Sequence, residues 1–164
     1  MNPDESGILE RVLVRRYGEP ELKLDRGMRT KVWRGNTELA SELYYWTDWS
    51  RPPASDFRMH QPIYGNCCGG ILVNGSLKVA MPSAEKRFGV YNIRELLARM
   101  EVQRAMALDP ELSFFMDAAN VWFFGHKQGR LFVYDHPFDE LYERGPIESA
   151  LEEIIVEWEE AKSP

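Results

Sequence analysis

An Asn-Gly pair between two short runs of strand-forming residues constrains the fold of this chain more than any other feature. Asn74-Gly75 stands between Ile71-Leu72-Val73 and residues 76–81, and Pro82 follows. Asn-Gly readily adopts the two positive φ values of a type I′ turn, whose twist matches that of the flanking strands. The segment therefore predicts a β-hairpin, and Pro82 ends its second strand because proline has no amide to donate.

A second hairpin is predicted further along the chain. Residues 121–125 and 130–135 are dense in aromatic and β-branched side chains, and the short loop between them contains Gly129. Apolar residues at successive positions indicate strands that are covered on both faces. Short strands are also expected at residues 22–25 and 30–33, where polar and apolar residues alternate, although the first of these could equally be extended loop.

Four helices are predicted from apolar residues at helical spacing. They are expected near residues 8–17, 36–46, 92–108 and 146–160. The third has the clearest start, because Asn92 can accept a hydrogen bond from the backbone amide of Glu95, whose carboxylate reaches back. Asp109-Pro110 ends it. We expect Met100 and Leu108 to be buried with the apolar residues of this helix.

Hairpins rather than strand-helix-strand crossovers imply an antiparallel sheet with helices packed on it. At 164 residues, of which 44% are hydrophobic, one core is the default. We therefore predict a single α+β domain over residues 1–164, with one mostly antiparallel sheet. No apolar run approaches the roughly 20 residues that cross a bilayer, and the acidic N-terminus does not resemble a secretory signal.

The two cysteines, Cys67 and Cys68, are adjacent, which suits neither a disulfide-stapled scaffold nor the usual zinc spacing. The expected location is the cytoplasm, and no metal or cofactor is expected. The chain has no nucleotide-binding, metalloprotease, hydrolase or calcium-binding motif. We therefore expect a binding module without catalytic residues.

The C-terminal end is strongly acidic, although the whole chain carries a net charge of only −6. Two bases, Arg144 and Lys162, accompany the following acids: Asp135, Asp139, Glu140, Glu143, Glu148, Glu152, Glu153, Glu157, Glu159 and Glu160. Phosphate binding needs a basic patch, so nucleic acid is disfavoured. A basic protein partner is favoured by charge complementarity, with Glu148, Glu152 and Glu159 as expected contacts. The alternative is a merely solvated helix surface.

A Pro-rich segment with aromatic and arginine side chains is a second candidate surface. Trp, Tyr and Arg are the side chains that most often anchor interfaces. The alternative is that these aromatic rings cap the core beneath the loop. The candidate partner-binding residues of this segment are Trp46, Trp49, Arg51, Phe57, Arg58 and Tyr64.

His126 and His136 are separated by a strand that spans roughly 20 Å, so they cannot share a metal or a proton.

Two further functions stay open. His60 lies near Cys67 and Cys68 in the sequence, and a small thiol-dependent or hydrolytic enzyme would use His60 with one of them. The third possibility is a self-associating scaffold subunit. Whether the chain is a monomer or a homodimer is left open, and no membrane partner is expected.

The C-terminal part of the chain resembles the SUKH superfamily, small α+β proteins of which many are bacterial immunity proteins. The resemblance rests on the helix start at residues 92–97, Phe123-Phe124-Gly125, Gly129, residues 131–135 and Gly145-Pro146-Ile147. They cover less than half of the chain. The family usually has Leu-Pro before its second helix, where this chain has Asn36-Thr37. The resemblance implies inhibition of a partner protein by binding, without catalysis.

Overall fold

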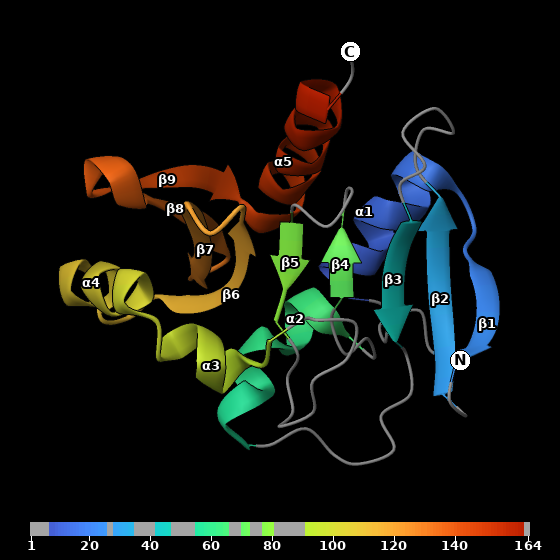
Figure 1. Ribbon diagram of the computed structural model, residues 1–164, viewed down its shortest axis with the longest axis horizontal. Coiled ribbons are helices and arrows are strands. Elements are labelled where there is room, and N and C mark those ends of the chain that lie inside the picture. The colour runs from blue at the N-terminus through green and yellow to red at the C-terminus, as the bar shows by residue number, and fades with distance from the viewer. Residues whose placement is uncertain are drawn as a thin grey trace.

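The computed structural model describes residues 7–25, 28–34, 42–46, 55–65, 70–72, 77–80 and 91–162. They form two antiparallel sheets with helices packed against them (Figure 1), which confirms the predicted α+β class. In chain order the elements are α1 (Ile8–Tyr17), β1 (Glu21–Asp25), β2 (Met28–Arg34), β3 (Glu42–Trp46), the 3-10 helix η3 (Ser55–His60), α2 (Gln61–Tyr64), β4 (Gly70–Leu72), β5 (Leu77–Val79), α3 (Ile93–Leu97), α4 (Met100–Leu108), β6 (Ser113–Ala118), β7 (Trp122–Lys127), β8 (Arg130–Asp135), the 3-10 helix η4 (His136–Phe138), β9 (Glu140–Pro146) and α5 (Ile147–Lys162).

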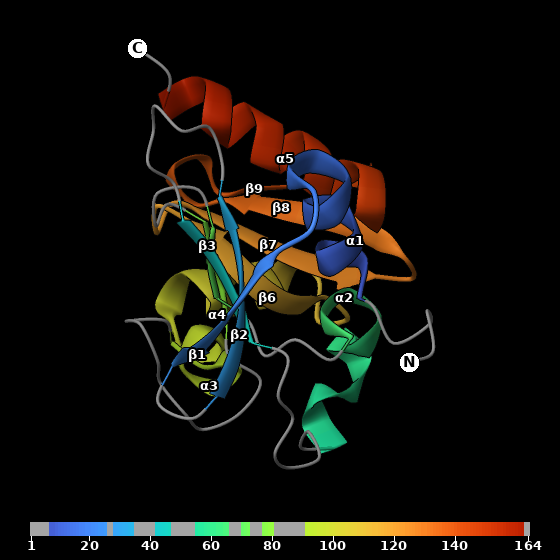
Figure 2. The same cartoon turned by 90° about the vertical axis from the view of Figure 1, so that its right-hand side faces the viewer.

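The larger sheet has six strands in the order β4-β5-β6-β7-β8-β9, so sequential strands are neighbours throughout. Helices α1 and α5 cover one face and α3 and α4 cover the other (Figures 1 and 2). On β7, Phe124 joins the core under α1 and α5, whereas Phe123 joins the core under α3 and α4. The prediction that the second hairpin is covered on both faces is therefore confirmed.

The smaller sheet has the order β1-β2-β3 and corrects two predictions. A helix was expected near residues 36–46, but residues 42–46 are strand β3, in which Tyr44 pairs with Val32 of β2. The consecutive Leu43-Tyr44-Tyr45-Trp46 are good strand formers, and β2 offers them a free edge. The predicted single sheet is also wrong, because β1, β2 and β3 form a sheet of their own. The expected helix start at Asn36 or Thr37 lies outside the described residues.

The first predicted hairpin is present as β4 and β5, which pair with Leu72 opposite Leu77. That register centres on Asn74-Gly75, and the turn itself lies outside the described residues. Strands β6 and β9, which extend the sheet on either side of the second hairpin, were not predicted. Strand β6 lies between β5 and β7 and buries Phe114, Phe115 and Met116 completely.

The helix expected over residues 92–108 begins as predicted but is broken in two. The Asn92 side chain accepts a hydrogen bond from the Glu95 amide at 2.8 Å, and the Glu95 carboxylate accepts one from the Asn92 amide at 3.3 Å. The backbone then becomes extended at Arg99, before α4. This break turns α4 so that Val102 and Ala105 are buried.

The break also corrects the expectation that Met100 and Leu108 are buried. They are 70% and 54% exposed. Arg99 holds the break in place, because its guanidinium donates a hydrogen bond to Asn120 at 2.7 Å and lies 5.1 Å from the centre of the Phe123 ring. The end of the helix at Asp109 is as predicted.

Candidate functional site

The acidic side of α5 that faces α1 is neutralised within the chain. Helices α1 and α5 lie side by side (Figure 2), and three arginines of α1 meet the three glutamates that were expected to contact a partner. The ion pairs are Arg11–Glu148 at 3.0 Å, Arg15–Glu152 at 3.1 Å and Arg16–Glu159 at 3.2 Å. Because these charges are already compensated, this side of α5 is a poor attractor for a basic partner.

A second row of acids lies on the opposite side of α5, over strand β9. Glu157 and Glu153 both contact the guanidinium of Arg144, at 2.9 and 3.7 Å. Their side chains are 58% and 65% exposed, whereas that of Arg144 is 21% exposed. Two carboxylates around one guanidinium leave this region with a net negative charge.

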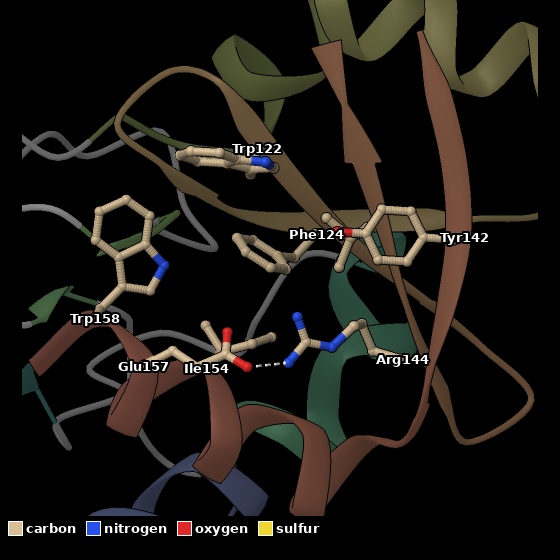
Figure 3. Close-up of a pocket in the computed structure, with 8 residues that line it drawn as sticks. Trp122, Phe124, Tyr142, Arg144, Ile154, Glu157 and Trp158 are labelled. Atoms are coloured by element: carbon tan, nitrogen blue, oxygen red, sulfur yellow. Dashed lines mark hydrogen bonds and ion pairs between the residues drawn. The ribbon is translucent and has the colours of Figure 1, made fainter. Parts of the chain in front are cut away.

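Beside this second row, a pocket of about 340 Å³ opens between α5 and the strands β7, β8 and β9. Figure 3 shows Trp122 and Trp158 on one side of the hollow, Tyr142 on the other and Phe124 between them. Arg144 and Glu157 lie along its lower edge and are joined by their ion pair. The lining residues are Trp122, Phe124, Val133, Tyr142, Arg144, Ile154, Glu157 and Trp158.

The strand register explains why these side chains meet. Phe124 pairs with Val133, and Val133 pairs with Tyr142, so one cross-strand row forms the floor and one wall of the pocket. Trp122 is two residues from Phe124 and therefore points to the same face of the sheet. Its indole meets that of Trp158 edge to face, with the ring centroids 5.6 Å apart and the planes at 70°.

Arg144 follows Tyr142 by two residues on β9, so strand alternation directs it to the face of the pocket, and β9 has a bulge at this position. Leu131 pairs with Gly145 and Phe132 pairs with Glu143, so Arg144 is the extra residue on β9. A bulge of this kind bends the strand. Gly145 has φ +107°, a conformation that other residues rarely adopt, so glycine is required beside the bulge.

Of the residues predicted from the Pro-rich segment, the two whose side chains the structure describes, Arg58 and Tyr64, do not line this pocket. Tyr64 is fully buried, and its hydroxyl donates a hydrogen bond to the carbonyl oxygen of Ala80 at 2.6 Å. For Tyr64 the alternative interpretation, a ring that completes the core, therefore holds. Arg58 is exposed. The side chains of Trp46 and Phe57, and the whole of Trp49 and Arg51, lie outside the described residues.

His60 forms a contact that the sequence did not predict. It is 1% exposed, and its Nδ1 lies 2.9 Å from Nε2 of His126 on β7. The rings of Phe115 and Tyr64 surround the pair, with centroids 6.1 and 6.0 Å from that of His60. One imidazole must donate and the other accept, so at least the accepting ring is neutral.

Burial lowers the pKa of both histidines. The pKa of His60 is lowered to about 3, mainly by desolvation and to a smaller extent by the neighbouring His126. Desolvation lowers the pKa of His126 to about 4. A ring that stays neutral in a hydrophobic setting suits a structural role. Cys67 and Cys68, the expected partners of His60 in an enzyme, lie outside the described residues. Among the side chains that the structure does describe, no group of three His, Cys, Asp or Glu could hold a metal ion.

The pocket was missed because its parts carry weak sequence signals. Trp158 belongs to the predicted apolar stripe of the last helix, and Trp122 belongs to a predicted strand, so both read as core residues. Tyr142 and Arg144 lie on β9, which was not predicted as a strand. Spacing along the chain cannot show that these residues converge.

The comparisons with known proteins add no assignment. No protein-family model, no curated protein and no solved structure matches the chain. The resemblance of residues 91–160 to the SUKH superfamily therefore stays a prediction. Within the described parts of the chain, no helix has the length and apolar character needed to cross a membrane.

Proposed function

We propose that this chain is a cytoplasmic protein-binding module that receives its partner on the face formed by α5 and β9. The observation that carries the proposal is the aromatic pocket at the centre of that face. Two tryptophans and a tyrosine line it, and Tyr142 is 40% exposed. Tryptophan, tyrosine and arginine are the residues on which interface energies most often depend.

The position of the pocket supports a macromolecular partner. Strand β9 is an edge of the six-stranded sheet, so the pocket opens where another chain has access to both the sheet edge and α5 (Figure 3). The exposed carboxylates of Glu153 and Glu157 flank it. A basic partner would therefore be attracted to this side of α5 rather than to the side that α1 neutralises.

The resemblance to the SUKH superfamily supports a narrower form of the proposal. In this form the chain is an immunity-like inhibitor that masks a toxin or another basic protein by covering it. The absence of any expected catalytic motif in the sequence is compatible with action by binding alone. We place the function in the cytoplasm because the adjacent Cys67 and Cys68 do not suit a disulfide-stapled secreted protein.

A displayed library of random peptides, selected against the intact protein, tests the proposal. Each recovered peptide is measured against the wild type, against Tyr142→Ser in the pocket wall and against Phe138→Ser. Phe138 is a matched control, because it is 73% exposed and does not line the pocket. We expect peptides that lose at least tenfold in affinity with Tyr142→Ser and little with Phe138→Ser. Peptides that tolerate both changes, or a selection without binders, would contradict the proposal.

A further inference from the structure

The charges around the pocket restrict what can occupy it. Among the lining residues that the structure describes, Arg144 is the one cationic group, and it is held by Glu157 at 2.9 Å and by Glu153 at 3.7 Å. An acidic ligand would have to displace one of these carboxylates before it could use the guanidinium. A cation meets the reverse situation, because the two carboxylates together carry one charge more than Arg144 compensates.

The aromatic lining favours a cation for a second, independent reason. The face of an indole or phenol ring carries partial negative charge and attracts a cation within about 6 Å of its centre. Trp122 and Trp158 meet edge to face, which leaves ring surface of both available to the hollow (Figure 3). Tyr142 adds a third ring on the opposite side.

The remaining lining residues are apolar and suit the stem of a long basic side chain. Phe124, Val133 and Ile154 form the inner surface of the pocket. Basic side chains bury their methylene groups against such surfaces while the charged head stays near carboxylates and water. A planar guanidinium also stacks on aromatic rings, which a compact ammonium does less well.

We propose that the pocket binds the side chain of an arginine presented by the partner protein. Its guanidinium lies against the indoles of Trp122 and Trp158 and beside the carboxylate of Glu157, and its stem contacts Ile154. This inference rests on the proposed function, because it names the chemical group by which the partner is recognised on the α5–β9 face. The arginine is bound as an intact side chain, without any covalent step.

Capped tripeptides that differ only in the central residue test the inference. Gly-Arg-Gly is compared with Gly-citrulline-Gly, its neutral isostere, and with the lysine, phenylalanine and glutamate versions. Binding is followed by the indole N–H signals of Trp122 and Trp158 in NMR spectra of the intact protein, assigned with Trp→Phe variants. We expect the arginine peptide to bind at least fivefold more tightly than the citrulline peptide and more tightly than the lysine peptide.

Two variants of α5 separate the local charge from the general charge of the helix. Glu157→Gln removes the carboxylate in the pocket, whereas Glu152→Gln removes one on the side facing α1. We expect Glu157→Gln to weaken arginine binding about fivefold to tenfold and Glu152→Gln to weaken it less than twofold, in line with a short-range interaction.

The outcomes distinguish this inference from the proposed function. Equal binding of the arginine and citrulline peptides, or tighter binding of the lysine, phenylalanine or glutamate peptide, would overturn the arginine assignment while the pocket remained a peptide-binding site. If no tripeptide shifts either indole signal, the arginine assignment is also wrong. In that case library-selected peptides that depend on Tyr142 would still uphold the proposed function, and peptides that ignore it would remove both.

Discussion

Acidification should destabilise this fold through the buried pair His60–His126. Burial keeps the folded-state pKa values near 3 and 4, below the ordinary histidine value of 6.5. The neutral pair therefore contributes its full stability above pH 6.5. That contribution is lost as the pH falls from 6.5 towards the folded-state values, because the unfolded chain then binds protons that the folded chain does not.

The size of the effect follows from the difference between pH 5 and 6.5. One pKa unit corresponds to about 1.36 kcal/mol, so at pH 5 the fully buried His60 costs about 2 kcal/mol. His126 is partly exposed, and its contribution is smaller, about 1 kcal/mol after allowance for solvent screening. Together they lower the free energy of unfolding by roughly 3 kcal/mol between pH 8 and pH 5.

Asp117 acts in the opposite direction. Burial raises its pKa to about 6, although a hydrogen bond from the Asn120 amide to its carboxylate, at 2.9 Å, and the charge of Lys78 lower it. A raised carboxyl pKa gives stability that is present at low pH and is lost as the pH rises from about 4 to 6. When the pH falls from 8 to 5, Asp117 therefore raises the free energy of unfolding by about 1 kcal/mol, which partly offsets the loss caused by the two histidines.

The assay therefore compares two proteins rather than one. Urea unfolding of the wild type and of His126→Gln is measured at pH 8, 7, 6 and 5, since the difference between them cancels the Asp117 contribution. At pH 8 the variant is the less stable protein, because the contact with His60 is changed. We expect its disadvantage to shrink by about 1 kcal/mol at pH 5. A difference that does not change with pH would show that burial does not lower the pKa of His126.

Three further stability changes follow from local geometry, each measured by urea unfolding at pH 8. Asn92→Ala removes the capping bond to Glu95 and should cost about 1 kcal/mol; an unchanged midpoint would contradict the cap. Gly7→Ala would place a methyl group 2.3 Å from the carbonyl oxygen of Ile63 and should cost more than about 3 kcal/mol, or prevent folding; normal stability would show that the α1–α2 contact is wrong. Arg15→Gln removes an exposed ion pair with Glu152 and should leave the urea midpoint nearly unchanged, and a clear drop in the midpoint would show that the pair is more than a surface contact.

The parts of the fold that could be predicted were those with a strong local signal. The strands at residues 122–127 and 130–135 are dense in aromatic residues, and Asn92 with Glu95 is a helix start that depends on adjacent residues only. Strand β3 was mistaken for a helix because its strand character depends on pairing with β2. Strand β6 was missed for a similar reason, since it is held between β5 and β7.

The candidate site depended almost wholly on contacts distant in sequence. The acidic character of the last helix was visible in the sequence. The sequence did not show that α1 would neutralise one side of this helix and leave the other side facing β9. The pairing of His60 with His126 joins residues 66 positions apart. The pocket requires the pairing of β9 with β8 and the course of α5 across the sheet, and neither was evident from the order of residues.

A structure of the protein bound to the tightest library-selected peptide would show directly whether the pocket between α5 and β9 receives an arginine. We expect an arginine of the peptide in that hollow, with its guanidinium against the rings of Trp122 and Trp158 and next to Glu157. A peptide seated along the α1 side of α5, or on another face with the hollow left unfilled, would contradict this expectation.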